Sequence, residues 1–141
     1  MTDMKLFGSR SAGAAIIVSA LVTLAGCAAL GPQTPEQQVQ QRADAYWKAR
    51  QSADFKAAYA LLTPAYRGLR DEQDFRQQFG AGVRILGVKV DGVTCEPEKC
   101  VARVGITAKP PIPGLNLPTI TTYMDDTWLL VDGQWWRHET P

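Results

Sequence analysis

Arg84-Ile85-Leu86-Gly87-Val88-Lys89-Val90 marks the point where the chain changes from a helical to a strand pattern. β-Branched residues are frequent in this stretch, as they are in strands generally. Before it, apolar residues recur at the spacing of a helix, and after it they alternate as in a strand. Helices first and antiparallel strands afterwards are typical of an α+β fold, in which the helices pack on one face of the sheet.

The helical half carries its own start and stop signals. Thr34-Pro35-Glu36-Gln37 predicts the first helix, because its threonine can cap the free backbone amides, its proline suits the first helical position and its glutamine completes a capping box. Asp54 is placed to cap a second helix that Pro64 ends, with a short turn opening at that proline. Asp71 is placed to cap a third helix that stops at Gly80.

The strand half is divided by turn residues. Gly92 predicts a bulge in the first strand, and Asp132-Gly133 predicts a tight hairpin. Five prolines or glycines in residues 109–118 predict an irregular loop, since proline cannot donate to a strand ladder. The strands predicted beyond the first one cover residues 100–107, 119–131 and 134–138.

Cys95 and Cys100 stand on either side of Glu-Pro-Glu-Lys. A four-residue hairpin loop sets two flanking side chains opposite one another, at the spacing that a disulfide requires. We therefore predict a structural disulfide. The alternatives are a redox pair, whose usual motif has two intervening residues, and a metal site, which would need further ligands in a chain with one histidine, His138.

The N-terminus reads as an export signal. Lys5 and Arg10 precede an apolar run over residues 12–24, which is too short for a hydrocarbon core that needs about 20 residues. The alternative is an ordinary cleaved signal in which Cys27 is incidental. Leu24-Ala25-Gly26-Cys27, however, resembles the lipobox of bacterial lipoprotein precursors.

The lipobox resemblance implies three N-terminal parts and a location. It makes residues 1–26 a signal peptide, Cys27 the lipidated first residue of the mature chain, and residues 27–34 a short tether with its membrane anchor. Two or more acyl chains give stable anchoring. In that family Ala28, in place of an aspartate, favours the outer membrane. We thus expect a protein of the bacterial cell envelope on the periplasmic face of the outer membrane.

The charge balance excludes some classes of partner. Removing residues 1–26 takes away Lys5, Arg10 and Asp3, so the 15 basic and 14 acidic residues of the whole chain become 13 of each. A neutral chain lacks the basic surface of a nucleic-acid binder. Residues 35–141 suit a single α+β domain with one core.

Three stretches carry a second resemblance, namely Ala43-Asp44-Ala45-Tyr46-Trp47, the segment from Ala53 to Pro64, and the Trp-flanked hairpin from Trp128 to Arg137. They resemble the nuclear-transport-factor-2-like (NTF2-like) superfamily, with its cystatin-like cone, and in particular its exported lipoproteins. The resemblance implies a strongly curved sheet that wraps one long helix and leaves a cavity at the open end. Such cavities bind apolar molecules, form dimer interfaces through the sheet face, or host acid–base chemistry.

Five residues are candidates for the lining of that cavity: Tyr46, Tyr59, Tyr123, Asp125 and Trp128. The aromatic ones suit the core equally well, because aromatic side chains bury much area. Asp125 and Asp126 could act as acid and base, but adjacent strand residues point to opposite faces, so a solvated bulge is the simpler interpretation. No cofactor motif, metal-ligand set or catalytic triad can be assembled.

We therefore expect a membrane-anchored, non-enzymatic envelope lipoprotein that binds an apolar small ligand or a protein partner, with a homodimer through the sheet face as one arrangement. A small cavity enzyme of isomerase or cyclase type is the alternative. An accessory subunit of an envelope assembly is a third hypothesis.

Overall fold

Helices precede strands in a computed structural model of the chain, as the change of pattern near residue 84 predicts. The structure describes residues 31–80, 84–110 and 116–141. The predicted signal peptide, Cys27 and the first part of the tether lie outside the described residues, as do residues 111–115 of the predicted loop. The elements are α1 (Pro35–Gln51), α2 (Phe55–Tyr59), α3 (Pro64–Leu69), α4 (Glu72–Gly80), β1 (Ile85–Cys95), β2 (Lys99–Ala108), β3 (Ile120–Val131) and β4 (Gln134–Arg137).

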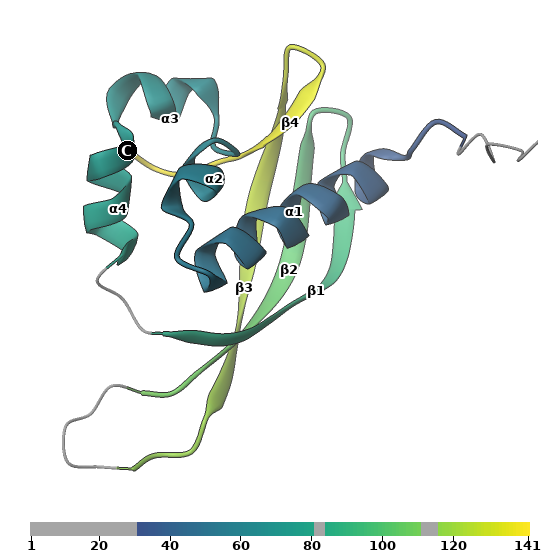
Figure 1. Cartoon of the computed structure of the whole chain (residues 1–141). Helices are drawn as coiled ribbons and strands as arrows, with labels where there is room; N and C mark the ends of the chain where they lie inside the picture. The colour runs from purple at the N-terminus through teal and green to yellow at the C-terminus, as the bar shows by residue number, and fades with distance from the viewer. Residues whose placement is uncertain (1–30, 81–83, 111–115) are drawn as a thin grey trace, which may run out of the picture. The chain divides into compact units, whose positions relative to one another are not determined.

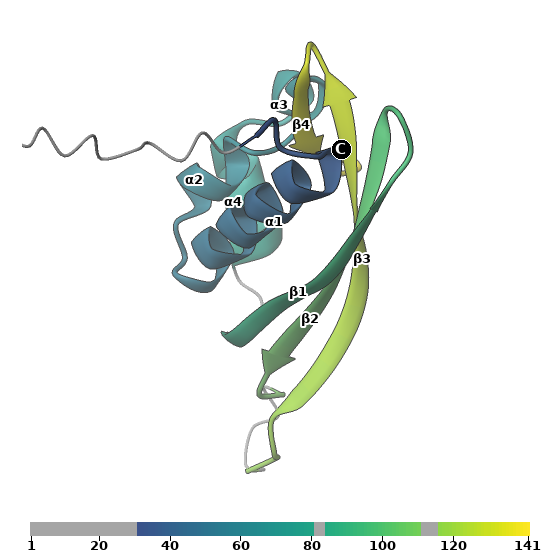
Figure 2. The same ribbon diagram turned by 90° about the vertical axis from the view of Figure 1, so that its right-hand side faces the viewer.

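The four strands form one antiparallel sheet in the order β1-β2-β3-β4. The sheet is strongly curved, and the helices lie on one side of it (Figures 1 and 2). Helix α1 packs against β1, β2 and β4. The prediction of an α+β fold with helices on a curved antiparallel sheet is confirmed.

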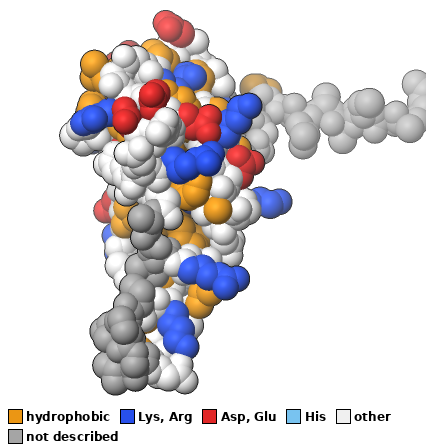
Figure 3. Space-filling model, turned by 60° about the vertical axis from the view of Figure 1, so that its left-hand side comes forward, with side chains coloured by type: hydrophobic (Ala, Val, Ile, Leu, Met, Phe, Trp, Pro, Cys, Tyr) orange, Lys and Arg blue, Asp and Glu red, His pale blue; other side chains and the backbone are white. Residues whose placement is uncertain are grey.

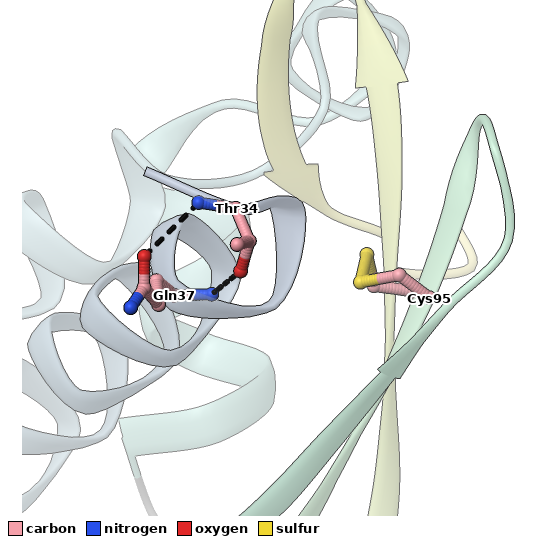
Figure 4. Close-up of a disulfide and its surroundings, with 4 residues drawn as sticks. Thr34, Gln37 and Cys95 are labelled. Atoms are coloured by element: carbon pink, nitrogen blue, oxygen red, sulfur yellow. Dashed lines mark hydrogen bonds between the residues drawn. A yellow bond between two sulfur atoms is a disulfide. The ribbon is translucent and has the colours of Figure 1, made fainter. Parts of the chain in front are cut away.

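Helix α1 begins where the capping box predicts. The Thr34 hydroxyl accepts a hydrogen bond from the Gln37 backbone N–H at 3.3 Å, and the Gln37 side chain accepts one from the Thr34 N–H at 3.0 Å (Figure 4). One face of the helix then enters the core. Its buried residues are Val39, Ala43, Tyr46, Trp47 and Ala49.

The second helix is shorter than predicted. Helix α2 ends at Tyr59, well before Pro64, because the segment between them pairs with β4. The Thr63 N–H donates to the Arg137 carbonyl at 3.0 Å, and the Arg137 N–H donates to the Leu61 carbonyl at 2.9 Å. A residue before proline favours extended backbone, so Thr63 suits this pairing and then caps α3.

The predicted turn signals in the strands are confirmed. The register of β1 against β2 shifts between Val90 and Gly92, which is the predicted bulge. Asp132 and Gly133 form the tight turn between β3 and β4 with φ values of 52° and 75°. Both residues therefore have left-handed backbone, which glycine and aspartate tolerate better than most residues.

The predicted disulfide is also confirmed. Cys95 and Cys100 face each other at the end of the β1–β2 pair and are bonded (Figure 4). The Glu96 N–H donates to the Lys99 carbonyl at 2.7 Å and closes the loop between them. Cys100 is fully buried, so the bridge ties the β1–β2 hairpin to the core.

Candidate functional site

None of the pockets formed by described residues brings the five predicted cavity-lining residues together. Tyr46 and Trp128 have no exposed surface and belong to the core between α1 and the sheet. Tyr59 packs against that core, and its hydroxyl donates to the Arg70 carbonyl at 2.8 Å. These three aromatic side chains are therefore part of the core or packed against it.

Tyr123 and Asp125 lie on the opposite face of the sheet. Tyr123 is 53% exposed, and the exposed Asp125 carboxylate accepts a hydrogen bond from Arg103 at 2.8 Å. The reason is the alternation of side chains along β3. Because Asp126 faces the helices, Tyr123 and Asp125 must point away from them.

Asp126 is the centre of a buried polar cluster. It is only 2% exposed, and β2 pairs with β3 through Asp125 and Asp126 without a register shift, so the prediction of a solvated bulge is wrong. Only the exposure of Asp125 is as predicted. One carboxylate oxygen accepts from the Trp47 indole N–H at 2.5 Å. The other accepts from the Arg137 guanidinium at 3.0 Å, and Arg137 is only 6% exposed. The two partners account for the burial, since aspartate is almost never fully buried unless it is paired.

Arg137 links this cluster to the helices and to the end of the chain. Its guanidinium lies 4.5 Å from the centre of the Tyr46 ring and also pairs with Glu139. Burial lowers the pKa of Arg137, but interactions with Tyr46 and Asp126 raise that pKa by more, so its net direction is upward. For Tyr46, in contrast to Arg137, burial itself raises the pKa. The cluster is thus a buried ion pair in which both carboxylate oxygens of Asp126 have a hydrogen-bond donor.

An apolar groove lies elsewhere, between α3, the end of β3 and the last residues of the chain. We call it the C-terminal groove; its volume is about 260 Å³. Leu69 on its α3 side is 71% exposed. The groove is lined by Thr63, Pro64, Ala65, Tyr66, Leu69, Leu129, Val131, His138, Glu139 and Pro141.

Other apolar side chains reach the surface in small patches. Figure 3 shows one face on which such patches lie among basic and acidic side chains. The exposed large apolar residues besides Leu69 are Leu86, Ile120, Tyr123 and Met124. They come from strands, whereas the C-terminal groove is bounded on two sides and is therefore better shaped for a small ligand.

Two further properties concern the described ranges alone. Within residues 31–80, 84–110 and 116–141, no group of three or more His, Cys, Asp or Glu side chains is arranged to hold a metal ion. None of the helices in those same ranges combines the length and the apolar character needed to cross a membrane.

Comparison with known proteins bears on the fold alone. No protein-family model matches the sequence, and no curated protein is similar enough to count as a relative. Among solved structures, the chain is similar to a SEC-C motif containing protein from Rhodopseudomonas palustris. The identity is 17%, over 75% of this chain and 76% of that one, with a TM-score of 0.54.

Two further solved structures are similar at lower scores. TsrD from Streptomyces laurentii is 19% identical over 74% of this chain and 87% of that one, with a TM-score of 0.49. An NTF2-like family protein from Streptomyces avermitilis is 14% identical over 72% of this chain and 91% of that one, with a TM-score of 0.46. Identities this low say nothing about ligands or reactions.

Proposed function

We propose that the protein is a lipid-anchored, non-enzymatic binding module of the bacterial cell envelope, and that its C-terminal groove binds an apolar small molecule. The observation that carries the proposal is the lining of the groove, which combines an exposed leucine with the apolar side chains of β3 and α3. Small-molecule sites are concave and mostly apolar, with a few polar groups. Here Thr63 and His138 supply polar atoms beside an apolar floor.

Binding fits the side chains of the groove better than catalysis does. Glu139 contributes a carboxylate to the groove, but this carboxylate is already paired with Arg137. His138, which also lines the groove, is exposed. Asp126, the most deeply buried acid of the described residues, has a partner on each carboxylate oxygen and lines none of the described pockets. An isomerase or cyclase would need a base with a free lone pair facing its substrate.

Three observations support the location. Leu24-Ala25-Gly26-Cys27 resembles a lipobox, so Cys27 is the proposed acceptor of the lipid. The Cys95–Cys100 disulfide suits the oxidising environment that an exported protein meets. Ala28 beside the proposed anchor favours the outer membrane under the sorting rule of the lipoprotein family.

The groove is tested with N-phenyl-1-naphthylamine, a neutral probe that fluoresces in apolar sites, and with residues 28–141, which contain every described helix and strand. Leu69→Ser should weaken probe binding about tenfold, because burying a leucine is worth roughly 1.5–3 kcal/mol. Ala65→Trp should fill the groove and abolish binding. Leu86→Ser is the matched control, since Leu86 is also exposed, at 43%, but lies outside the groove.

Equal probe binding by all three variants and the wild type would refute the groove as the site. Concentration-dependent dimers or larger complexes that Leu69→Ser abolishes, without probe binding, would show a protein partner instead. The anchor is tested separately by labelling the full chain with palmitate in a bacterial host. Label that persists in Cys27→Ser would contradict lipidation at that residue.

A further inference from the structure

A second pocket, of about 270 Å³, lies between α1 and the turn that joins β3 to β4. We call it the glutamine pocket. Its side chains are amides, one guanidinium and one indole, with no carboxylate among them. The lining residues are Gln33, Gln38, Gln41, Arg42, Gly133, Gln134 and Trp135.

Arg42 is the only charged residue among the described residues that line the glutamine pocket. Its guanidinium lies 5.1 Å from the centre of the Trp136 ring. Its Nε atom is buried without a hydrogen-bond partner, and no carboxylate of the described residues pairs with it. Burial lowers the pKa of Arg42. The guanidinium of Arg42 is therefore left to pair with an anionic group of a ligand.

Arg67 is a second arginine beside Trp136, and its Nε donor has a partner. It lies 5.0 Å from the centre of the same Trp136 ring but outside the glutamine pocket. Its Nε donates to the Leu62 carbonyl at 3.1 Å. Stacking on Trp136 therefore does not by itself leave the Nε donor of an arginine without a partner. Arg50 and Arg137 also have a buried Nε without one, so what sets Arg42 apart is its place in the pocket.

The amides of the pocket add neutral donors. The Gln38 side chain donates to the Gln33 carbonyl at 3.0 Å. The side-chain amides of Gln41 and Gln134 make no hydrogen bond with any described residue and are available to a ligand. A planar guanidinium with neighbouring amide donors matches a group with several acceptor oxygens and a negative charge.

We propose that the glutamine pocket binds the phosphate group of an organic phosphate monoester, with Arg42 as the charged partner and Gln41 and Gln134 as neutral donors. The pocket is larger than one phosphate needs, so part of the attached alcohol enters it too. This site is separate from the C-terminal groove and does not depend on the proposed apolar ligand.

The phosphate could come from a soluble metabolite or from a lipid head group. Gln33 is six residues from Cys27, and an extended chain of six residues spans about 20 Å. A lipid on Cys27 would therefore hold the pocket within reach of the head groups of the same membrane. A soluble ester and a membrane-bound ester must accordingly be tested side by side.

The experiment titrates residues 28–141 with glycerol 3-phosphate, and in parallel with vesicles of phosphatidylcholine with and without phosphatidic acid. Binding is followed by the NMR shifts of the Gly133 and Gln134 amides. Arg42→Gln should weaken binding about tenfold or more, because a hydrogen bond to a charged group is strong. Arg67→Gln is the matched control, since it also removes a cation from Trp136 but leaves the pocket intact.

Binding of either ester that depends on Arg42 and not on Arg67 supports the proposal, and the arm that binds identifies the source. Three results would overturn it: no shift at Gly133 or Gln134 with either ester, equal losses in Arg42→Gln and Arg67→Gln, or equal binding of glycerol without phosphate. Far-ultraviolet circular dichroism of both variants confirms that they are folded before the titration is read.

Discussion

Replacing Asp126 with alanine should destabilise the protein by about 4 kcal/mol. Removing one partner of a buried ion pair costs about 3–5 kcal/mol, because the other charge stays buried. Glu139 still pairs with Arg137 in the variant, which keeps this cost near the lower end of that range. The indole N–H of Trp47 also loses its acceptor, and an unsatisfied buried donor adds about 1–3 kcal/mol.

The assay is urea unfolding of residues 28–141 with the disulfide intact, followed by tryptophan fluorescence and by circular dichroism. Asp125→Ala is the matched control: it removes the neighbouring carboxylate and the exposed pair with Arg103, which should cost less than about 1 kcal/mol. Removing both buried charges in Asp126→Ala/Arg137→Met should be less damaging than the two single losses added together.

A loss of stability below about 1 kcal/mol for Asp126→Ala would refute the reasoning. Removing a buried carboxylate that accepts two hydrogen bonds should cost more than breaking a surface ion pair. Equal losses in Asp126→Ala and Asp125→Ala would do the same. Strict additivity in the double variant would show that Asp126 and Arg137 do not interact.

Three further predictions concern stability. Cys95→Ala/Cys100→Ala should lower the free energy of unfolding by about 2 kcal/mol, since the closed loop is short, and the urea midpoint measures this. Thr34→Ala should lower the free energy of unfolding by about 1 kcal/mol because the helix cap is lost, whereas Thr34→Ser should keep most of the stability that the cap provides. Thermal unfolding compares the two variants. Because burial raises the pKa of Tyr46 above 10.0, the unfolded chain loses that proton first. Its contribution to stability is complete below pH 10 and falls as the pH rises through the folded pKa; Tyr46→Phe should flatten this decline in unfolding experiments at successive pH values.

The parts of the fold that sequence predicts well are those with local causes. The capping box at Thr34, the bulge at Gly92 and the turn at Asp132-Gly133 each follow from a few neighbouring residues, and all three are found where they are expected. The disulfide belongs to the same group, because the loop between Cys95 and Cys100 is short enough to determine its geometry.

The buried role of Asp126 was missed, although the sequence holds the information. Counting back from the Asp132-Gly133 turn places Arg137 opposite Trp128. Residues two apart on a strand share a face, so Asp126 lies on the face of Trp128, next to that arginine. An aspartate that shares a face with a core tryptophan and an arginine is a candidate for a buried ion pair rather than for a solvated bulge.

The C-terminal groove could not be predicted in the same way, because its walls meet through a contact between distant segments. The backbone of Arg137 pairs with Leu61 and Thr63, which places the start of α3 beside the last strand. The side chain of the same residue points into the core and pairs with Asp126. Arg137 therefore couples the stability of the core to the position of one wall of the groove. Loss of its side chain should disturb apolar binding without removing any atom that lines the groove, which separates a positioning effect from a direct contact such as that of Leu69.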